Sequence, residues 1–246
     1  MTSITPENLL AELRRAADVV TGIAAGLDDA AVAAPSELPG WTRGHVLAHI
    51  TGIANAMARQ VEYATRGERV ELYDGGFDGR NRAIELAAGH GADQHRAAVC
   101  AAIDRALSAF GSLDEAGWRA PITFRDGVVL DGGLALWREL TIHATDLGTG
   151  RGPETWSRPF CEHLFDFLAA RVPEGQRFVL QPLGLPSVAI GAPGGRSTAI
   201  NGMLTDIAAW LAGRTPTLGS LRATAAADGV DLPALLPWPA GVPVSK

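Results

Sequence analysis

Cysteine is scarce in this chain: Cys100 and Cys161 are the two among 246 residues. Two isolated cysteines do not make a disulfide framework, so we interpret both as small core side chains of a protein in a reducing compartment. Residues 1–7 lack the basic and apolar regions of a signal peptide, and no run of about 18 apolar residues is present to span a membrane. These absences predict a cytoplasmic protein with no membrane partner.

Positive charge is also limited. The formal net charge is −6 at pH 7, and the sequence contains no block of lysine and arginine. Because nucleic-acid binding requires a basic surface, we expect no nucleic-acid partner. The chain is 47% hydrophobic and 20% charged, which is typical of a globular protein, and it is long enough for one large domain or two modest ones.

The first 150 residues follow a helical pattern. Thr5-Pro6-Glu7 is a capped helix start, and apolar residues then recur at helical spacing to about Gly26. Further segments are expected to be a helix at residues 43–65, a loop at 67–79, a short helix at 80–88, a helix at 93–110, an extended hairpin at 119–130 and a helix at 134–147. The four long helices predict a four-helix bundle.

The pattern changes at the glycine-rich segment 148–153, which we interpret as a linker. Beyond it we expect a helix at residues 159–170, strands at 177–180 and 187–190, a helix at 199–213 and a proline-rich tail. The predicted fold class is therefore α+β with two domains. Residues 1–150 would form the bundle and residues 151–246 a small α+β domain.

Two pairs of polar residues on the predicted helices have metal-ligand spacing. His45 and His49 are four residues apart, and so are Glu139 and His143. Residues four apart share one face of a helix, and two such pairs on facing helices are a common way to build a metal site in a bundle. Two histidines and one carboxylate are also the three-ligand set of a catalytic zinc, which keeps a fourth position open.

The helical wheel separates the two histidines of the first pair. At about 100° per residue His49 borders the apolar arc of its helix, whereas His45 lies further toward solvent. His45 is then a fourth ligand, a neighbour that orients a ligand, or a proton shuttle, and Asp146 is a candidate to orient His143 from behind. Spacing alone leaves another interpretation open, in which Glu139 and His143 are a plain helical side-chain pair.

Residues 38–50 contain the pattern Trp-Thr-x-Gly-His-x-x-x-His, and residues 137–147 contain the pair Glu139 and His143 on a predicted helix. Both segments resemble those of the mycothiol-dependent maleylpyruvate isomerases and related enzymes with a DinB-like bundle, in which the second segment is the metal-binding fourth helix. Residues 80–85, 209–214 and 232–238 resemble the family's short helix, its last helix and its usual ending. The resemblance spans nearly the whole chain, and it implies a DinB-like bundle followed by the C-terminal domain of this family.

The resemblance also implies roles for individual residues. His49, Glu139 and His143 match the zinc ligands, and Arg214 matches an arginine of the C-terminal domain that binds a substrate carboxylate. An alternative for Arg214 is a cation at a helix end, favoured by the helix dipole, with Arg222 as the next candidate for the substrate.

Two further arginines, Arg80 and Arg82, are candidates for binding the thiol or the substrate. A solvated loop face is the alternative for both. The preceding loop, residues 73–78, departs from the family sequences, which leaves open a native substrate other than maleylpyruvate.

The implied reaction uses two cofactors, zinc and mycothiol. A zinc-bound thiol is deprotonated, and the thiolate would add to the cis double bond of maleylpyruvate, so that rotation and elimination give fumarylpyruvate. His49 and Arg214 would then be catalytic, in a site expected between the two domains. A mycothiol S-transferase acting on an electrophilic xenobiotic or biosynthetic intermediate would need the same groups. A non-catalytic binding or regulatory bundle would be expected to lack a ligand.

Overall fold

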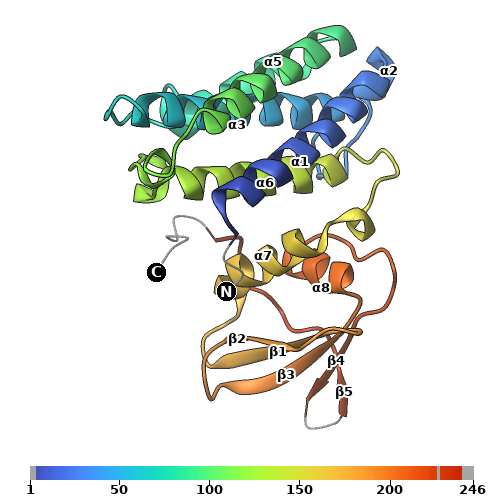
Figure 1. Cartoon of the computed structure of the whole chain (residues 1–246). Coiled ribbons are helices and arrows are strands. Elements are labelled where there is room, and N and C mark those ends of the chain that lie inside the picture. The colour runs from blue at the N-terminus through green and yellow to red at the C-terminus, as the bar shows by residue number, and fades with distance from the viewer. Residues whose placement is uncertain (1–3, 226–227, 240–246) are drawn as a thin grey trace. The chain divides into compact units, whose positions relative to one another are not determined.

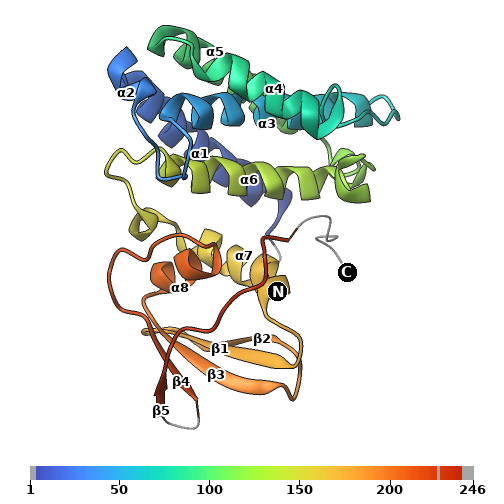
Figure 2. The same cartoon turned by 180° about the vertical axis from the view of Figure 1, so that it is seen from behind.

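The structure is a computed structural model that describes residues 4–225 and 228–239. The chain divides into two compact units, which meet in sequence between Gly150 and Arg151. Figures 1 and 2 show the helical unit and the mixed helix–sheet unit from opposite sides. The α+β fold class is as predicted.

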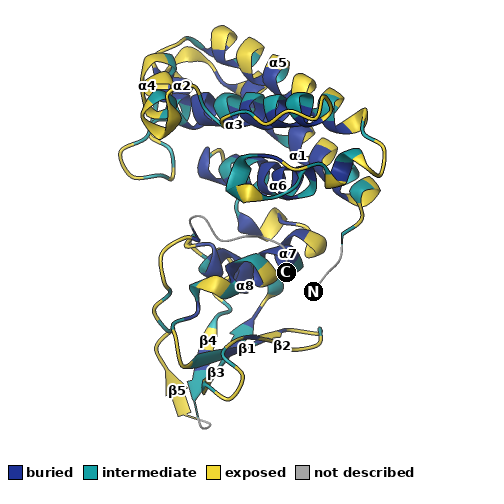
Figure 3. Ribbon diagram, turned by 90° about the vertical axis from the view of Figure 1, so that its left-hand side faces the viewer, coloured by how far each residue is buried: buried dark blue, intermediate teal, exposed yellow. Residues whose placement is uncertain are grey.

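The helical unit is built on four long helices, α1 (Pro6–Gly26), α3 (Arg43–Ala64), α5 (Ala92–Gly111) and α6 (Val129–Asp146). Helices α1 and α3 each pack against both α5 and α6, which closes a four-helix bundle. The short helices α2 (Asp29–Ala33) and α4 (Gly76–Ala88) pack on α3. Figure 3 shows exposed residues of α5 on the outer side of the bundle, while its buried residues, such as Val99 and Ile103, belong to the core.

The expected helix starts are confirmed at α1 and α3. Thr5 accepts a hydrogen bond from the backbone N–H of Asn8 at 3.3 Å. Thr42 caps α3 in the same way through the N–H of His45, at 3.4 Å. These bonds satisfy donors that the first turn of a helix leaves without a partner.

The prediction of an extended hairpin at residues 119–130 is wrong. The segment forms two short 3₁₀ turns, Gly117–Arg119 and Phe124–Asp126, and a single antiparallel bridge joins Pro121 to Val128. Helix α6 then begins at Val129, five residues before the expected start, and includes Gly132 and Gly133. A Cβ atom on Gly133 would lie 3.0 Å from Leu9 and 3.2 Å from Trp118, so this glycine permits close packing and does not end the helix.

The second unit contains a five-stranded sheet in the order β2-β1-β3-β4-β5. The strands are β1 (Gln176–Pro182), β2 (Val188–Gly191), β3 (Arg196–Gly202), β4 (Arg222–Ala225) and β5 (Asp228–Val230), and the β1–β3 pair is parallel. Helices α7 (Arg158–Leu168) and α8 (Leu204–Leu211) pack together, and α8 also packs on β1 and β3.

The helix expected at residues 199–213 is wrong in its first part, because residues 199–202 belong to β3. Strand β3 pairs with β1 over seven residues, and this long-range pairing decides the structure of residues whose alanine and isoleucine also fit a helix. Among the described residues, no helix has the length and apolar character needed to cross a lipid bilayer.

Candidate metal centre

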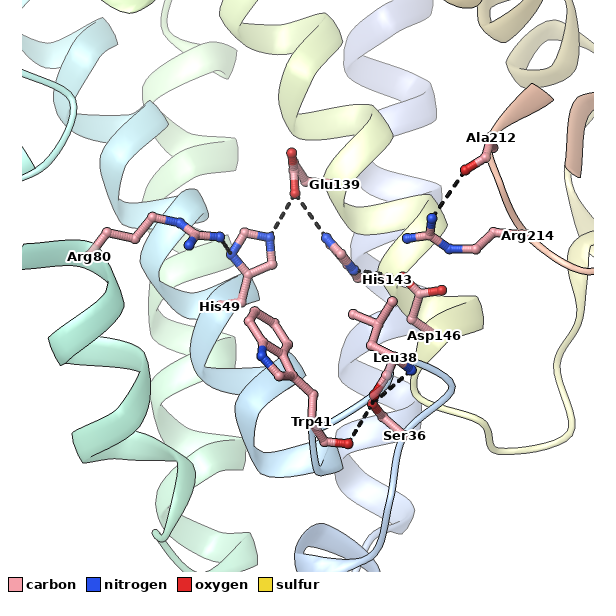
Figure 4. Close-up of polar contacts among 10 residues, drawn as sticks. All are labelled: Ser36, Leu38, Trp41, His49, Arg80, Glu139, His143, Asp146, Ala212 and Arg214. Atoms are coloured by element: carbon pink, nitrogen blue, oxygen red, sulfur yellow. Dashed lines mark hydrogen bonds and ion pairs between the residues drawn. The ribbon is translucent and has the colours of Figure 1, made fainter. Parts of the chain in front are cut away.

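The bundle brings His49, Glu139 and His143 together around one carboxylate oxygen (Figure 4). Oε2 of Glu139 lies 2.8 Å from Nε2 of His49 and 3.1 Å from Nε2 of His143. One potential ligand atom from each residue lies within 4.8 Å of the others. The three residues therefore form a cluster with the donor set of a metal site.

The position of the cluster follows from the helices that carry it. Glu139 and His143 project from successive turns of α6, and His49 projects from α3, which packs directly against α6. His49 is 5% exposed, in agreement with its place at the border of the apolar arc. The rings of His49 and His143 meet edge to face, with centroids 4.5 Å apart.

The three clustered residues shift one another's pKa values. Burial disfavours the charged form of His143, but its hydrogen bonds with Asp146 and Glu139 outweigh burial and raise its pKa to about 9. Burial also opposes the ionised form of Glu139, yet the bonds from His143 and His49 hold its pKa well below the usual range. For His49 burial prevails and lowers the pKa. Without a metal, these shifts favour an imidazolium at His143, a carboxylate at Glu139 and a neutral imidazole at His49.

The hydrogen bonds fix where the protons lie. An ionised carboxylate only accepts, so Nε2 of both histidines donates to Glu139, and Nδ1 of His143 donates to Asp146 at 2.8 Å. Asp146 is fully buried. It can orient His143 from behind, as outer carboxylates do for metal-binding histidines. The two Nε2 protons that point at Glu139 are those that a metal ion would displace.

Arg80 contacts the cluster from α4. Its Nη2 donates to Nδ1 of His49 at 3.0 Å, on the side of the ring away from Glu139 (Figure 4). Arg82, the other arginine expected near the site, is exposed, and the structure gives it no bond to the three clustered residues.

His45 has a structural place at the start of α3. Its Nδ1 lies 2.8 Å from Oγ1 of Thr42 and accepts the backbone N–H of the same residue at 3.2 Å. Its Nε2 is 3.6 Å from Glu85. The ring stacks on Trp41, which in turn meets His49 edge on, with centroids 6.0 Å apart. His45 thus reaches the cluster through the packing of Trp41 and not through a hydrogen bond to it.

Arg214 and Arg222 belong to the second unit. Arg214 follows Gly213, which has a φ of +69° after α8, and its Nη1 donates to the carbonyl of Ala212 at 3.1 Å. Arg222 begins β4 and is exposed, and it donates to the carbonyls of Gly219 and Leu221.

A cavity of about 240 Å³ lies between α3, α4 and α5. His49 is part of its wall, together with Arg80 and with Tyr73 from the loop before α4. The remaining lining is mainly alanine and isoleucine, with Thr51, His90 and His95. Sequence reasoning missed Tyr73; its only signal there was that residues 73–78 depart from the family pattern.

Comparison with known proteins identifies both units. The family model described as the mycothiol maleylpyruvate isomerase N-terminal domain matches residues 13–148, and the MDMPI C-terminal domain matches residues 155–237. No protein of curated function matches the chain.

Two crystal structures share the fold. One is of the mycothiol-dependent maleylpyruvate isomerase, which is 23% identical with a TM-score of 0.79. The other is of a histidine-to-alanine mutant of such an isomerase, which is 22% identical with a TM-score of 0.78. In each case the match covers 90% of this chain and 93% of the other. By the two matching domain models, the chain belongs to the mycothiol maleylpyruvate isomerase family.

Proposed function

We propose that this protein is a zinc-dependent enzyme that uses mycothiol to isomerise maleylpyruvate to fumarylpyruvate in the cytoplasm. The observation that carries the proposal is the complete cluster of His49, Glu139 and His143 in a chain of this family. Residues 1–150 would form the metal-binding domain that activates the thiol, and residues 151–246 the domain that contributes to substrate binding.

The clustered residues fit zinc. One ligand atom from each of the three residues lies within 4.8 Å of the others, so a single metal ion could be held by all three. Two imidazole nitrogens and a carboxylate leave a fourth position for an exogenous ligand. When bound, the metal supplies a Lewis acid that keeps a coordinated thiol deprotonated at neutral pH.

The surrounding residues would hold the site and its ligands. Asp146 would keep Nδ1 of His143 protonated and its Nε2 directed at the site. Arg80 supplies a positive charge beside His49 that suits an anionic ligand. We assign the carboxylate of the substrate to Arg214, whose planar guanidinium can bind both carboxylate oxygens.

A mycothiol S-transferase is the second candidate. It is favoured by the loop at residues 73–78, which departs from the family pattern and places Tyr73 in the wall of the cavity beside His49. A transferase would retain the thiol on its product and would need the same three ligands. A non-catalytic binding or regulatory bundle is disfavoured, because all three ligands are present.

Metal analysis tests the first part of the proposal. Purified protein should contain about one zinc per chain, His49→Ala should lose it, and His90→Ala, which changes an exposed histidine, should retain it. Wild-type protein that binds no zinc would contradict the proposal.

An assay with mycothiol and maleylpyruvate tests the reaction. Fumarylpyruvate should form only when the thiol is present, and Glu139→Gln should abolish its formation. A stable adduct of mycothiol with the electrophile, without isomerisation, would identify the transferase. No reaction with any thiol would favour the binding module.

A further inference from the structure

Tyr73 lines the cavity beside His49, and the reaction above assigns it no role. Arg80 and His49 line the same cavity, so a small molecule within it would lie beside a tyrosine, an arginine and a candidate metal ligand. Ligand sites of this kind combine a mainly apolar lining with a few polar groups. With about 240 Å³ the cavity is below the usual size for drug-like ligands, which favours a small molecule as occupant.

The position of Tyr73 is fixed by bonds on both sides of it. Before it, the carbonyl of Val70 accepts a hydrogen bond of 2.6 Å from the side chain of Gln60 on α3. After it, Arg59 of α3 forms an ion pair of 2.6 Å with Asp74. The ring of Tyr73 also contacts that of Phe77, with centroids 6.1 Å apart. The loop therefore holds the phenol against the cavity.

The glycines at the start of α4 contribute to this placement. Gly75 and Gly76 adopt φ values of +72° and +63°, which turn the chain directly after Tyr73 and Asp74. At Gly79 a Cβ atom would overlap the backbone carbonyl of Asp74. The first turn of α4 can therefore pack closely on the loop, and this brings Arg80 and Tyr73 to the same cavity.

We propose that Tyr73 is a catalytic hydrogen-bond donor that, with Arg80, holds the carbonyl oxygen of an unsaturated carbonyl substrate in this cavity. This inference rests on the proposed function, and it adds a residue for the reaction. A phenol oxygen that accepts from a guanidinium keeps its own O–H free to donate.

The role follows from the electron movement in the reaction. When the sulfur–carbon bond forms, the electron pair of the double bond moves through the conjugated system onto the carbonyl oxygen and gives an enolate. Tyr73 donates a hydrogen bond to this oxygen and retains its proton. After rotation about the former double bond, the electron pair returns from the enolate oxygen to re-form the double bond. The sulfur–carbon bond breaks in the same step and the thiolate leaves. The cycle balances with no reactant besides the thiol.

The electrostatics of the phenol agree with this role. Burial, with a contribution from Glu139, raises the pKa of Tyr73 to about 12, although Arg80 acts in the opposite direction. The hydroxyl group therefore stays protonated throughout the neutral range. A donor fixed toward a developing oxyanion stabilises the transition state more than the ground state.

Kinetics of Tyr73→Phe give the first test. The change removes one oxygen atom, and kcat should fall about 100-fold or more with KM nearly unchanged, as for loss of one oxyanion donor. The matched control is Tyr63→Phe, which changes the other of the two tyrosines, on α3, and should keep full activity. Unchanged kcat in Tyr73→Phe would overturn the proposal, whereas a wild-type protein inactive with every thiol would overturn the proposed function.

A binding measurement tests the contact without turnover. Protein labelled with ¹³C at the ring carbon that bears the hydroxyl has two tyrosine signals, and Tyr63→Phe identifies that of Tyr73. Acetylpyruvate, which has an enolisable carbonyl but no electrophilic double bond, should shift the Tyr73 signal saturably, both with metal bound and after chelation. A Tyr73 signal that does not move at saturating acetylpyruvate would overturn the proposal, even if Tyr73→Phe were inactive.

Discussion

Nδ1 of His143 donates a hydrogen bond of 2.8 Å to the carboxylate of Asp146, which is fully buried three residues further along α6. The bond fixes the ring so that Nε2 points at Glu139, 3.1 Å away. Asp146 thus acts on the candidate metal site through His143 and not as a ligand itself.

Asp146→Asn should weaken metal binding by about 10- to 100-fold, because outer carboxylates orient histidine ligands and make them more basic. Competition with a chelator of known affinity measures the effect. Asp206→Asn is the control, since Asp206 is equally buried but accepts its hydrogen bonds from Leu218 and Ser220 of the second unit. Equal losses of metal affinity in both variants would argue for a general effect of destabilisation.

Arg80→Gln should strengthen metal binding in the absence of a thiol. Arg80 donates a hydrogen bond to Nδ1 of His49, so the proton of that ring lies on Nε2, the atom that would bind the metal. A neutral imidazole that binds metal through Nε2 carries its proton on Nδ1 and can no longer accept from Arg80. Metal binding must therefore break this bond and also places two positive charges close together. The same competition assay, with Arg82→Gln as the control, should show tighter binding for Arg80→Gln alone.

The stability of the metal-free protein should decrease as the pH rises through about 9. The pKa of His143 is raised to about 9 in the folded state from about 6.5 in an unfolded chain. The contribution of protonated His143 to the free energy of unfolding is therefore complete below about pH 6.5, and it is lost as the pH rises through the pKa of the folded state. Urea unfolding with a chelator present should show that the free energy of unfolding falls more from pH 7 to pH 10 for wild type than for His143→Gln. Identical losses would show that this histidine is not stabilised as an imidazolium.

Gly79→Ala should destabilise the bundle by about 1–3 kcal/mol, the usual cost of forcing an extra group into a packed site. The new methyl group would overlap the carbonyl of Asp74 and push α4 from the loop that carries Tyr73. Gly22→Ala is the control within α1, where a Cβ atom meets nothing within 4 Å. That change should stabilise the protein by about 0.5–1 kcal/mol, because alanine favours the helix. Denaturant unfolding of the two variants measures both the expected loss and the expected gain in the free energy of unfolding.

Local patterns in the amino-acid sequence predicted the long helices of the bundle and the three residues that cluster as a candidate metal site. Thr5 and Thr42 indicate where α1 and α3 begin, because a cap interacts with residues only a few positions away. Helical spacing places Glu139 and His143 on one face of α6. Such local rules also gave β1 and β2. They failed at residues 199–202, where pairing with β1 over a long sequence distance decides for a strand.

Contacts between side chains from distant segments could not be predicted, because they depend on how the helices and loops pack in three dimensions. The sequence position of Arg80 does not indicate that it donates to His49. Gly132-Gly133 predicts a helix boundary from sequence alone, but in the structure Leu9 and Trp118 pack against Gly133 inside α6. The place of Tyr73 is likewise set by Gln60 and by Arg59 through contacts with its neighbours in the loop. Each of these depends on a side chain at least ten residues away in sequence, which no local pattern records.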